Sequence, residues 1–101
     1  MDDVTALLTA ADRIEALAAR TTPGDWRPAG LLASRPEVVA HRGDGGTEHV
    51  AEARAASGAW IVAFSPALAG PLVELLRSAA AQPAPEPAAV ALARALLDRL
   101  P

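Results

Sequence analysis

The residues best suited to acid–base or metal chemistry are the two histidines, His41 and His49. Glu48 is expected to lie across a β-hairpin from His41, and a His–Glu pair can act as a general base or as two metal ligands. The same hairpin register places His49 on the opposite face, so a metal site needs a third ligand from another element. A solvated hairpin pair is the simpler interpretation. We therefore predict no catalytic residue, no metal and no cofactor.

Other reactive residue types lack the context that their chemistry requires. Ser57 and Ser65 have no Gly-x-Ser-x-Gly surroundings, and both are predicted to cap helices. The glycine-rich segment 43–46 is not followed by Gly-Lys-Ser/Thr, so we expect a turn there and no phosphate loop. The chain has no cysteine, which excludes disulfides, thiolate zinc sites and iron–sulfur clusters.

Charge and hydropathy limit the possible partners. The formal net charge is −3, all nine basic residues are arginines, and they are spread singly along the chain, so nucleic-acid binding is not expected. The chain starts with Met1-Asp2-Asp3, which is acidic, whereas a secretory signal starts with basic residues. No long apolar stretch follows, so we expect no secretory signal. The longest apolar run, residues 59–64, is far shorter than the roughly 20 residues of a membrane span. We expect a cytoplasmic protein that does not bind membranes.

The first element that positions these residues is an amphipathic helix over residues 3–20. Its apolar residues recur at the spacing of one helix face. They are Val4, Leu7, Leu8, Ala11, Ile14, Leu17 and Ala18. Asp2 or Asp3 can cap its first turn, and Pro23-Gly24 ends it.

Three short β candidates follow, at residues 26–33, 37–42 and 47–54. The last two flank the turn at 43–46 and are predicted to pair as a hairpin, with Val39 opposite Val50 and Val38 opposite Ala51. We expect the face that carries Val38, Ala40, His49, Ala51 and Ala53 to pack against the helices.

The remainder of the chain reads as helices. Leu68, Leu72, Leu75 and Leu76 form a stripe, and Gly70-Pro71 predicts a kink or a late helix start. The chain is expected to be an α+β protein with an N-terminal helix, a small antiparallel β-hairpin or three-stranded meander, and two to three further helices. We predict one α+β domain over residues 1–81, a Pro-rich spacer at 82–87 and a C-terminal helix at 88–101.

The large apolar side chains divide into a predicted core and a predicted contact surface. The core is expected to contain Leu7, Leu8, Ile14, Trp60, Phe64, Leu72 and Leu76. Trp26 follows a Pro-Gly turn, and it can be a core residue or a binding anchor. The C-terminal helix carries an apolar stripe outside the compact domain. This stripe must be covered either by the chain's own core or by a partner, and we favour packing against a second copy because the Pro-rich spacer is stiff. The stripe is Val90, Ala93, Leu96, Leu97 and Leu100.

Short motifs in residues 10–80 resemble small actinobacterial and actinophage proteins of unknown function, among them the Ead-like phage proteins. The matching motifs are Thr22-Pro23-Gly24-Asp25-Trp26, Val50-Ala51-Glu52, Trp60-Ile61 and Leu72-Val73-Glu74-Leu75-Leu76. The chain has Asp25 where the commoner form has a second proline, Ser57 in place of an acidic cap, and an additional proline at Pro71. The resemblance implies a shared fold and a phage or mobile-element origin, and it supplies no catalytic residue.

Three functional hypotheses follow. The first is a non-enzymatic accessory or protein-interaction module that binds a second copy of itself, through Trp26 and the C-terminal stripe. The second is a small acidic regulator that neutralises a basic partner, as an antitoxin does. The third is a small enzyme that uses His41, Glu48 and Arg42.

Overall fold

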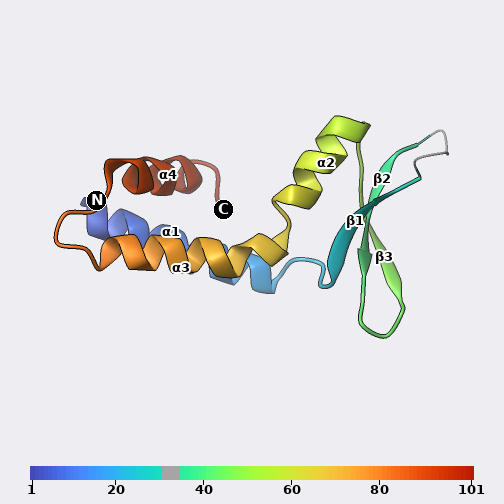
Figure 1. The fold of residues 1–101 in the computed structure, drawn as a ribbon, viewed down its shortest axis with the longest axis horizontal. Helices are drawn as coiled ribbons and strands as arrows, with labels where there is room; N and C mark the ends of the chain where they lie inside the picture. Colours follow the sequence, from blue (N-terminus) through green and yellow to red (C-terminus); the bar gives the residue numbers. More distant parts are fainter. Residues whose placement is uncertain (31–34) are drawn as a thin grey trace. The chain divides into compact units, whose positions relative to one another are not determined.

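The computed structural model describes residues 1–30 and 35–101 of the 101-residue chain. The elements, in chain order, are α1 (Asp3–Ala19), β1 (Asp25–Ala29), β2 (Glu37–His41), β3 (Thr47–Glu52), α2 (Ala55–Ala63), the 3-10 helix η1 (Pro66–Leu68), α3 (Ala69–Ala80) and α4 (Pro87–Leu97) (Figure 1). An N-terminal helix, a three-stranded antiparallel sheet and later helices confirm the predicted α+β class. Residues 31–33 of the first predicted strand lie outside the described residues.

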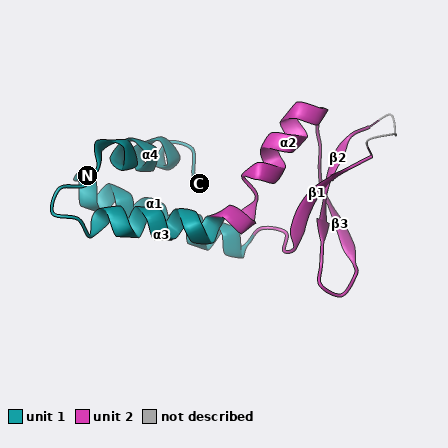
Figure 2. Cartoon of the chain, viewed as in Figure 1, with its two compact units in different colours: residues 1–20, 69–101 teal, residues 21–68 magenta. Residues whose placement is uncertain are grey.

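The chain forms two compact units, which Figure 2 colours separately. The helical unit combines Met1–Arg20 with Ala69–Pro101, and the sheet unit is Thr21–Leu68. This division differs from the predicted one, in which residues 1–81 form one domain and 88–101 stand apart. The difference arises because α1 packs against both α3 and α4, so the two ends of the chain share one core.

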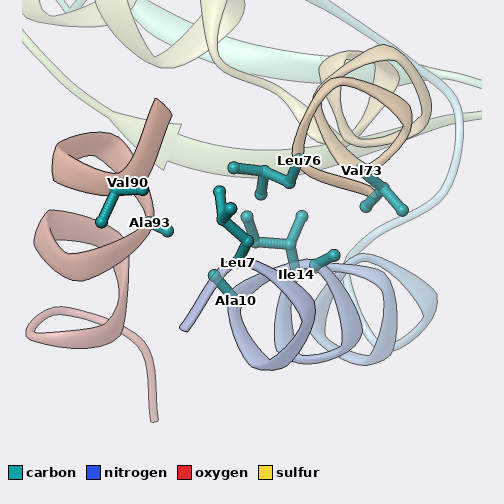
Figure 3. Packing of buried hydrophobic residues seen from close by; sticks show 8 residues of the cluster. Leu7, Ala10, Ile14, Val73, Leu76, Val90 and Ala93 are labelled. Carbon is teal, nitrogen blue, oxygen red and sulfur yellow. The ribbon is translucent and has the colours of Figure 1, made fainter. Parts of the chain in front are cut away.

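The core of the helical unit lies along α1. Its buried cluster comes from all three helices: Leu7, Ala10, Ala11, Ile14, Val73, Leu76, Val90 and Ala93. The labelled side chains of α1, α3 and α4 point toward one another in Figure 3. Leu7 and Leu76 are fully buried, and the alanines between them let the helices approach closely. The predicted core positions of Leu7, Ile14 and Leu76 are therefore confirmed. Leu72 is partly buried against the same cluster.

Leu8 does not belong to this core, contrary to the prediction. Leu8 is 42% exposed, whereas Ala6 and Ala10 are completely buried. The reason is that α3 and α4 pack against the side of α1 that carries small residues, which turns the buried stripe away from Leu8. Alanine spacing, and not leucine spacing alone, sets the buried face of this helix.

The C-terminal helix folds back onto its own chain. Val90 and Ala93 are buried in the shared core, and Leu96, Leu97 and Leu100 are partly buried against it. The expectation that this stripe lies outside the compact part of the chain is therefore wrong. A helix of 11 residues is marginal in water by itself, and the open apolar side of α1 gives it a surface within the chain.

The N-terminus of α1 is capped as the sequence predicts. Asp2 is the N-cap residue, and the Thr5 backbone N–H donates to its Oδ1 at 2.7 Å. This hydrogen bond lowers the pKa of the Asp2 carboxyl below its ordinary value. Because the folded-state pKa is lowered, the cap stabilises the fold above the unfolded-state pKa, and this contribution is lost as the pH falls through the folded-state pKa.

The sheet has the strand order β1-β2-β3, with both pairs antiparallel. The predicted hairpin is confirmed, and so is the pairing of Val38 with Ala51. The predicted pairing of Val39 with Val50 is wrong, because Val39 pairs with His49. The register contains a β-bulge: Val38 pairs with Ala51 but Val39 pairs with His49, so β3 has one extra residue between these pairs. The β3 side chains that precede this extra residue therefore point to the faces opposite to those predicted.

Helix α2 covers one face of the sheet. Val38 and Ala40 on β2 are fully buried, and Gly58 of α2 lies near the Val38 side chain. The predicted inward direction of Val38 and Ala40 is confirmed. The predicted cap is wrong: α2 begins at Ala55 with Arg54 as the N-cap residue, so Ser57 lies in the first turn.

The apolar stretch Ala55–Ala80 is long and apolar enough, by length and composition alone, to cross a membrane. In the structure it consists of α2, η1 and α3 in succession. Helix α3 begins at Ala69, so Gly70 and Pro71 lie in its first turn, as the predicted late start requires. Core helices of water-soluble proteins meet the same length and composition criterion, and α3 buries Val73 and Leu76 in the helical unit.

Replacing Leu76 with Ala should destabilise the protein by about 2–5 kcal/mol, because the side chain is fully buried in the shared core. Leu8 of α1, 42% exposed, provides a matched control whose replacement by Ala should change the free energy of unfolding by about 0.5 kcal/mol or less. Urea denaturation of the two variants measures both values. Equal effects of the two substitutions would contradict the assigned core.

Replacing Gly24 with Ala should destabilise the sheet unit by about 1–3 kcal/mol. Gly24 has a φ of +111°, and an added Cβ would lie 2.7 Å from the carbonyl oxygen of His41. The control is Gly43→Ala, where no atom lies within 4 Å of the added carbon. We expect this control to be as stable as the parent protein, and thermal denaturation followed by circular dichroism distinguishes the two variants.

Candidate interaction surface

The histidines lie on the sheet face opposite α2. The bulge places His49 opposite Val39, on the same face as His41 and Glu37. His49 Nδ1 lies 2.8 Å from Glu37 Oε2, and both side chains are substantially exposed. The prediction that the two histidines lie on opposite faces is therefore wrong, because it did not include the extra residue of β3.

The predicted His41–Glu48 pair is also not formed. Glu48 pairs with Ala40 in the sheet, while His41 pairs with Thr47. Glu48 Oε2 instead lies 3.7 Å from Arg42 Nη1. Among residues 1–30 and 35–101, no group of three or more histidine, cysteine or carboxylate side chains could hold a metal ion. The hairpin thus presents two separate, exposed pairs, His49 with Glu37 and Arg42 with Glu48.

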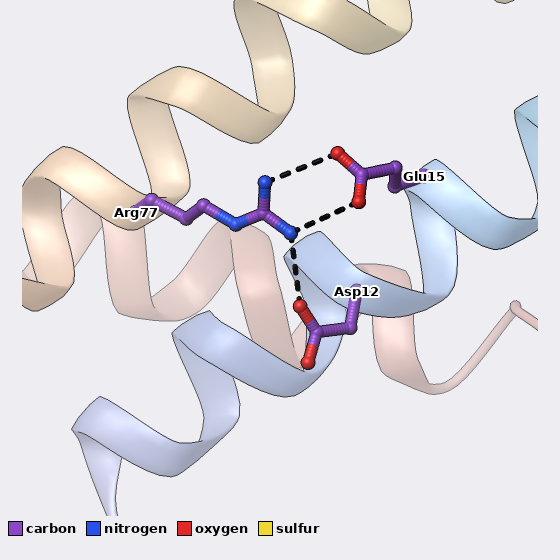
Figure 4. Close-up of polar contacts among 3 residues, drawn as sticks. All are labelled: Asp12, Glu15 and Arg77. Carbon is purple, nitrogen blue, oxygen red and sulfur yellow. Dashed lines mark hydrogen bonds and ion pairs between the residues drawn. The ribbon is translucent and has the colours of Figure 1, made fainter.

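Arg77 makes the most connected polar contact of the helical unit (Figure 4). Its guanidinium donates to Glu15 Oε2 at 3.1 Å and to Asp12 Oδ1 at 3.0 Å. These two carboxylates raise the pKa of Arg77 above its ordinary value. Arg94 contacts Asp3 at 2.9 Å in the same manner. Arg77 links α3 to α1 and Arg94 links α4 to α1, so both arginines hold the helices of this unit together.

The largest departure from the predicted core is the aromatic pair of α2. Trp60 is 68% exposed and Phe64 is 59% exposed, although both were expected to be buried. Their rings are stacked, with centroids 4.7 Å apart and an interplanar angle of 24°. A stacked pair of exposed aromatic side chains forms one continuous apolar surface.

The helical period explains this exposure. Gly58 and Ser65 are buried in the sheet unit and Ile61 and Val62 are partly buried, which defines the inward side of α2. Residues 60 and 64 are one turn apart and lie on the other side. Helix α2 lies close to the Val38 side chain at Gly58, where an added Cβ would already be 3.8 Å from Val38 Cγ2, so this inward position holds a glycine and has no room for an aromatic ring. The spacing of Gly58, Ile61, Val62 and Ser65 is the sequence signal that could have identified the outward aromatics.

The exposed side of α2 contains no charge. Between Ala55 and Phe64 the only polar side chain is that of Ser57, and Ala56, Ala59 and Ala63 are exposed beside the rings. A helix on a protein surface ordinarily presents charged or polar residues to water. Contiguous exposed apolar surface of this kind is typical of surfaces that bind other molecules. We call the side chains of Trp60, Phe64 and these alanines the aromatic face.

Trp26 has a different environment. It pairs with Ala40 in the sheet and is partly buried, and its indole N–H donates to the Thr22 carbonyl oxygen at 3.0 Å. A tryptophan held by its own loop has less surface to offer to a partner than Trp60 has. The C-terminal contact residues predicted with it (Val90, Leu96, Leu97 and Leu100) lie in or against the helical core. The most accessible aromatic surface is therefore on α2.

The chain shows no match to any known protein family, to any curated protein or to any solved structure.

Steady-state quenching with acrylamide should distinguish the two tryptophans. In Trp26→Phe, the remaining Trp60 should emit at long wavelength and be quenched strongly in dilute solution, because it is 68% exposed. In Trp60→Phe, the remaining Trp26 should emit at shorter wavelength and be quenched less, because it is partly buried and hydrogen-bonded. Equal quenching of the two variants would contradict the exposure assigned to α2.

Proposed function

We propose that this chain is a non-enzymatic protein-interaction module that associates with a second copy of itself through the aromatic face of α2. The single observation that carries the proposal is the stacked, exposed Trp60–Phe64 pair on a helix without charged residues. Tryptophan is enriched among the residues that contribute most to protein–protein binding. The proposal also places the protein in the cytoplasm and assigns it no membrane or nucleic-acid partner.

The apolar area is large enough to stabilise an association. An aromatic side chain buries about 150–250 Å² when it is covered. Roughly 60% of each residue is exposed and would be covered in a complex. At about 25 cal/mol per Å² of buried apolar surface, covering both rings contributes on the order of 5 kcal/mol to the free energy of association. This gain must exceed the cost of restricting two chains, so further contact area around the rings is needed for stable binding.

The two alternative functions have less support. An acidic regulator needs a continuous acidic surface, but most acidic side chains in the described part of the chain are near arginines, such as Asp12 and Glu15 beside Arg77 and Asp3 beside Arg94. An enzyme that uses His41 and Glu48 lacks the contact between these side chains that it would need. The phage or mobile-element origin rests on the resemblance of short motifs and stays a prediction.

The proposal is tested with the double variant Trp60→Ala/Phe64→Ala in size-exclusion chromatography with light scattering. The parent protein should be a dimer whose fraction rises with concentration, and the double variant should be a monomer with unchanged helical content. The matched control is Leu8→Ala, which removes an exposed leucine from the helical unit and should stay dimeric. A parent protein that is monomeric at its highest soluble concentration would refute self-association.

A further inference from the structure

The helical unit has an apolar groove between α3 and α4. These two helices both pack against α1 but contact each other little. The groove has a volume of about 440 Å³, and no residue of α1 lines it. Alanines form much of its lining, and Leu75 and Leu92 contribute its largest apolar side chains. Leu75 is 55% exposed and Leu92 is 37% exposed, so the groove is open to a partner.

The shape and composition of the groove suit a helix. Small side chains such as Ala79 and Ala89 permit a helix axis to approach within the 8–10 Å typical of packed helices. A helix placed there, together with α1, α3 and α4, would give four packed helices, which is a common way to complete an α-helical core. Helix-in-groove binding of this type uses apolar residues spaced three or four positions apart, as Trp60 and Phe64 are.

The charges of the two surfaces are complementary. Glu86 is the only charged residue that lines the groove, and within the described residues it has no ion-pair partner. Arg54, the N-cap residue of α2, is exposed and likewise has no ion-pair partner there, whereas Arg77 and Arg94 are engaged with α1. One unpaired positive charge thus lies at the start of the aromatic helix, and one unpaired negative charge lies in the groove.

We propose that α2 of a second copy of this chain docks into the α3–α4 groove, with its aromatic pair between Leu75 and Leu92 and its Arg54 beside Glu86. This inference rests on the proposed function and names the surface that receives the aromatic face. The two surfaces differ, and in a dimer with two-fold symmetry each copy supplies both, so every residue contact occurs twice.

The first experiment exchanges the charges. Arg54→Glu and Glu86→Arg should each weaken dimerisation by about three- to tenfold, because each places two like charges together. The double variant Arg54→Glu/Glu86→Arg should recover most of the parent affinity in sedimentation equilibrium. Losses that simply add in the double variant would overturn the pairing of Arg54 with Glu86.

The second experiment mixes two defective variants. Trp60→Ala/Phe64→Ala lacks the aromatic pair, and Leu75→Glu places a charge in the groove; each should be monomeric alone. Their mixture should give a 1:1 heterodimer, because one chain supplies an intact groove and the other an intact α2. Leu8→Glu, an equally charged change on an exposed leucine outside the groove lining, is the matched control and should stay dimeric. Unchanged circular dichroism spectra establish that all variants fold.

The outcomes separate the inference from the function on which it rests. If the aromatic variant is monomeric while Leu75→Glu stays dimeric, the aromatic face still mediates self-association but the groove is not its partner. If both variants are monomeric and mixing restores no heterodimer, reciprocal docking is overturned. If the parent protein itself is monomeric, both proposals fail.

Discussion

The packing of α1 between α3 and α4 is the constraint on which the rest of the structure depends. These helices come from opposite ends of the chain, and none of them has a complete core without α1. Alanines at positions 6, 10 and 11 let the partner helices approach closely, and Leu7 and Leu76 fill the space between them. Because the termini are held together, the sheet unit is a continuous insertion between α1 and α3.

The ion pairs of the helical unit also connect α3 and α4 to α1. The arginines of α3 and α4 reach back to carboxylates on α1, from Arg77 to Asp12 and Glu15 and from Arg94 to Asp3. Such exposed pairs stabilise a protein only modestly, and their value here is to set which side of each helix faces α1. A consequence is that most of the negative charge on α1 is matched locally. Arg54 and Glu86 are among the charged groups without an ion-pair partner in the described part of the chain.

In the sheet unit, the close approach of α2 to β2 decides where the aromatic side chains lie. Gly58 faces Val38 at close range, so the inward side of α2 holds glycine and aliphatic residues and has no space for two aromatic rings. The rings therefore remain on the outer side, where they stack on each other and not on a core. Exposed apolar surface of this kind favours aggregation unless another molecule covers it.

The sequence alone determined the elements and their order. Helical periodicity located α1, and the glycine turn located the β2–β3 hairpin, because both are local properties of the chain. The inward direction of Val38 and Ala40 also follows from strand alternation. The tertiary structure decided the rest. A single extra residue in β3 moved His49 to the face of His41 and removed the predicted His41–Glu48 pair, since a shift of one residue reverses every side chain before the bulge. The direction in which Trp60 and Phe64 point, and the return of α4 to α1, depend on which surfaces are left uncovered by distant parts of the chain. No local pattern contains that information, because hydrophobicity states only that a residue can be buried, and the space available elsewhere decides whether it is.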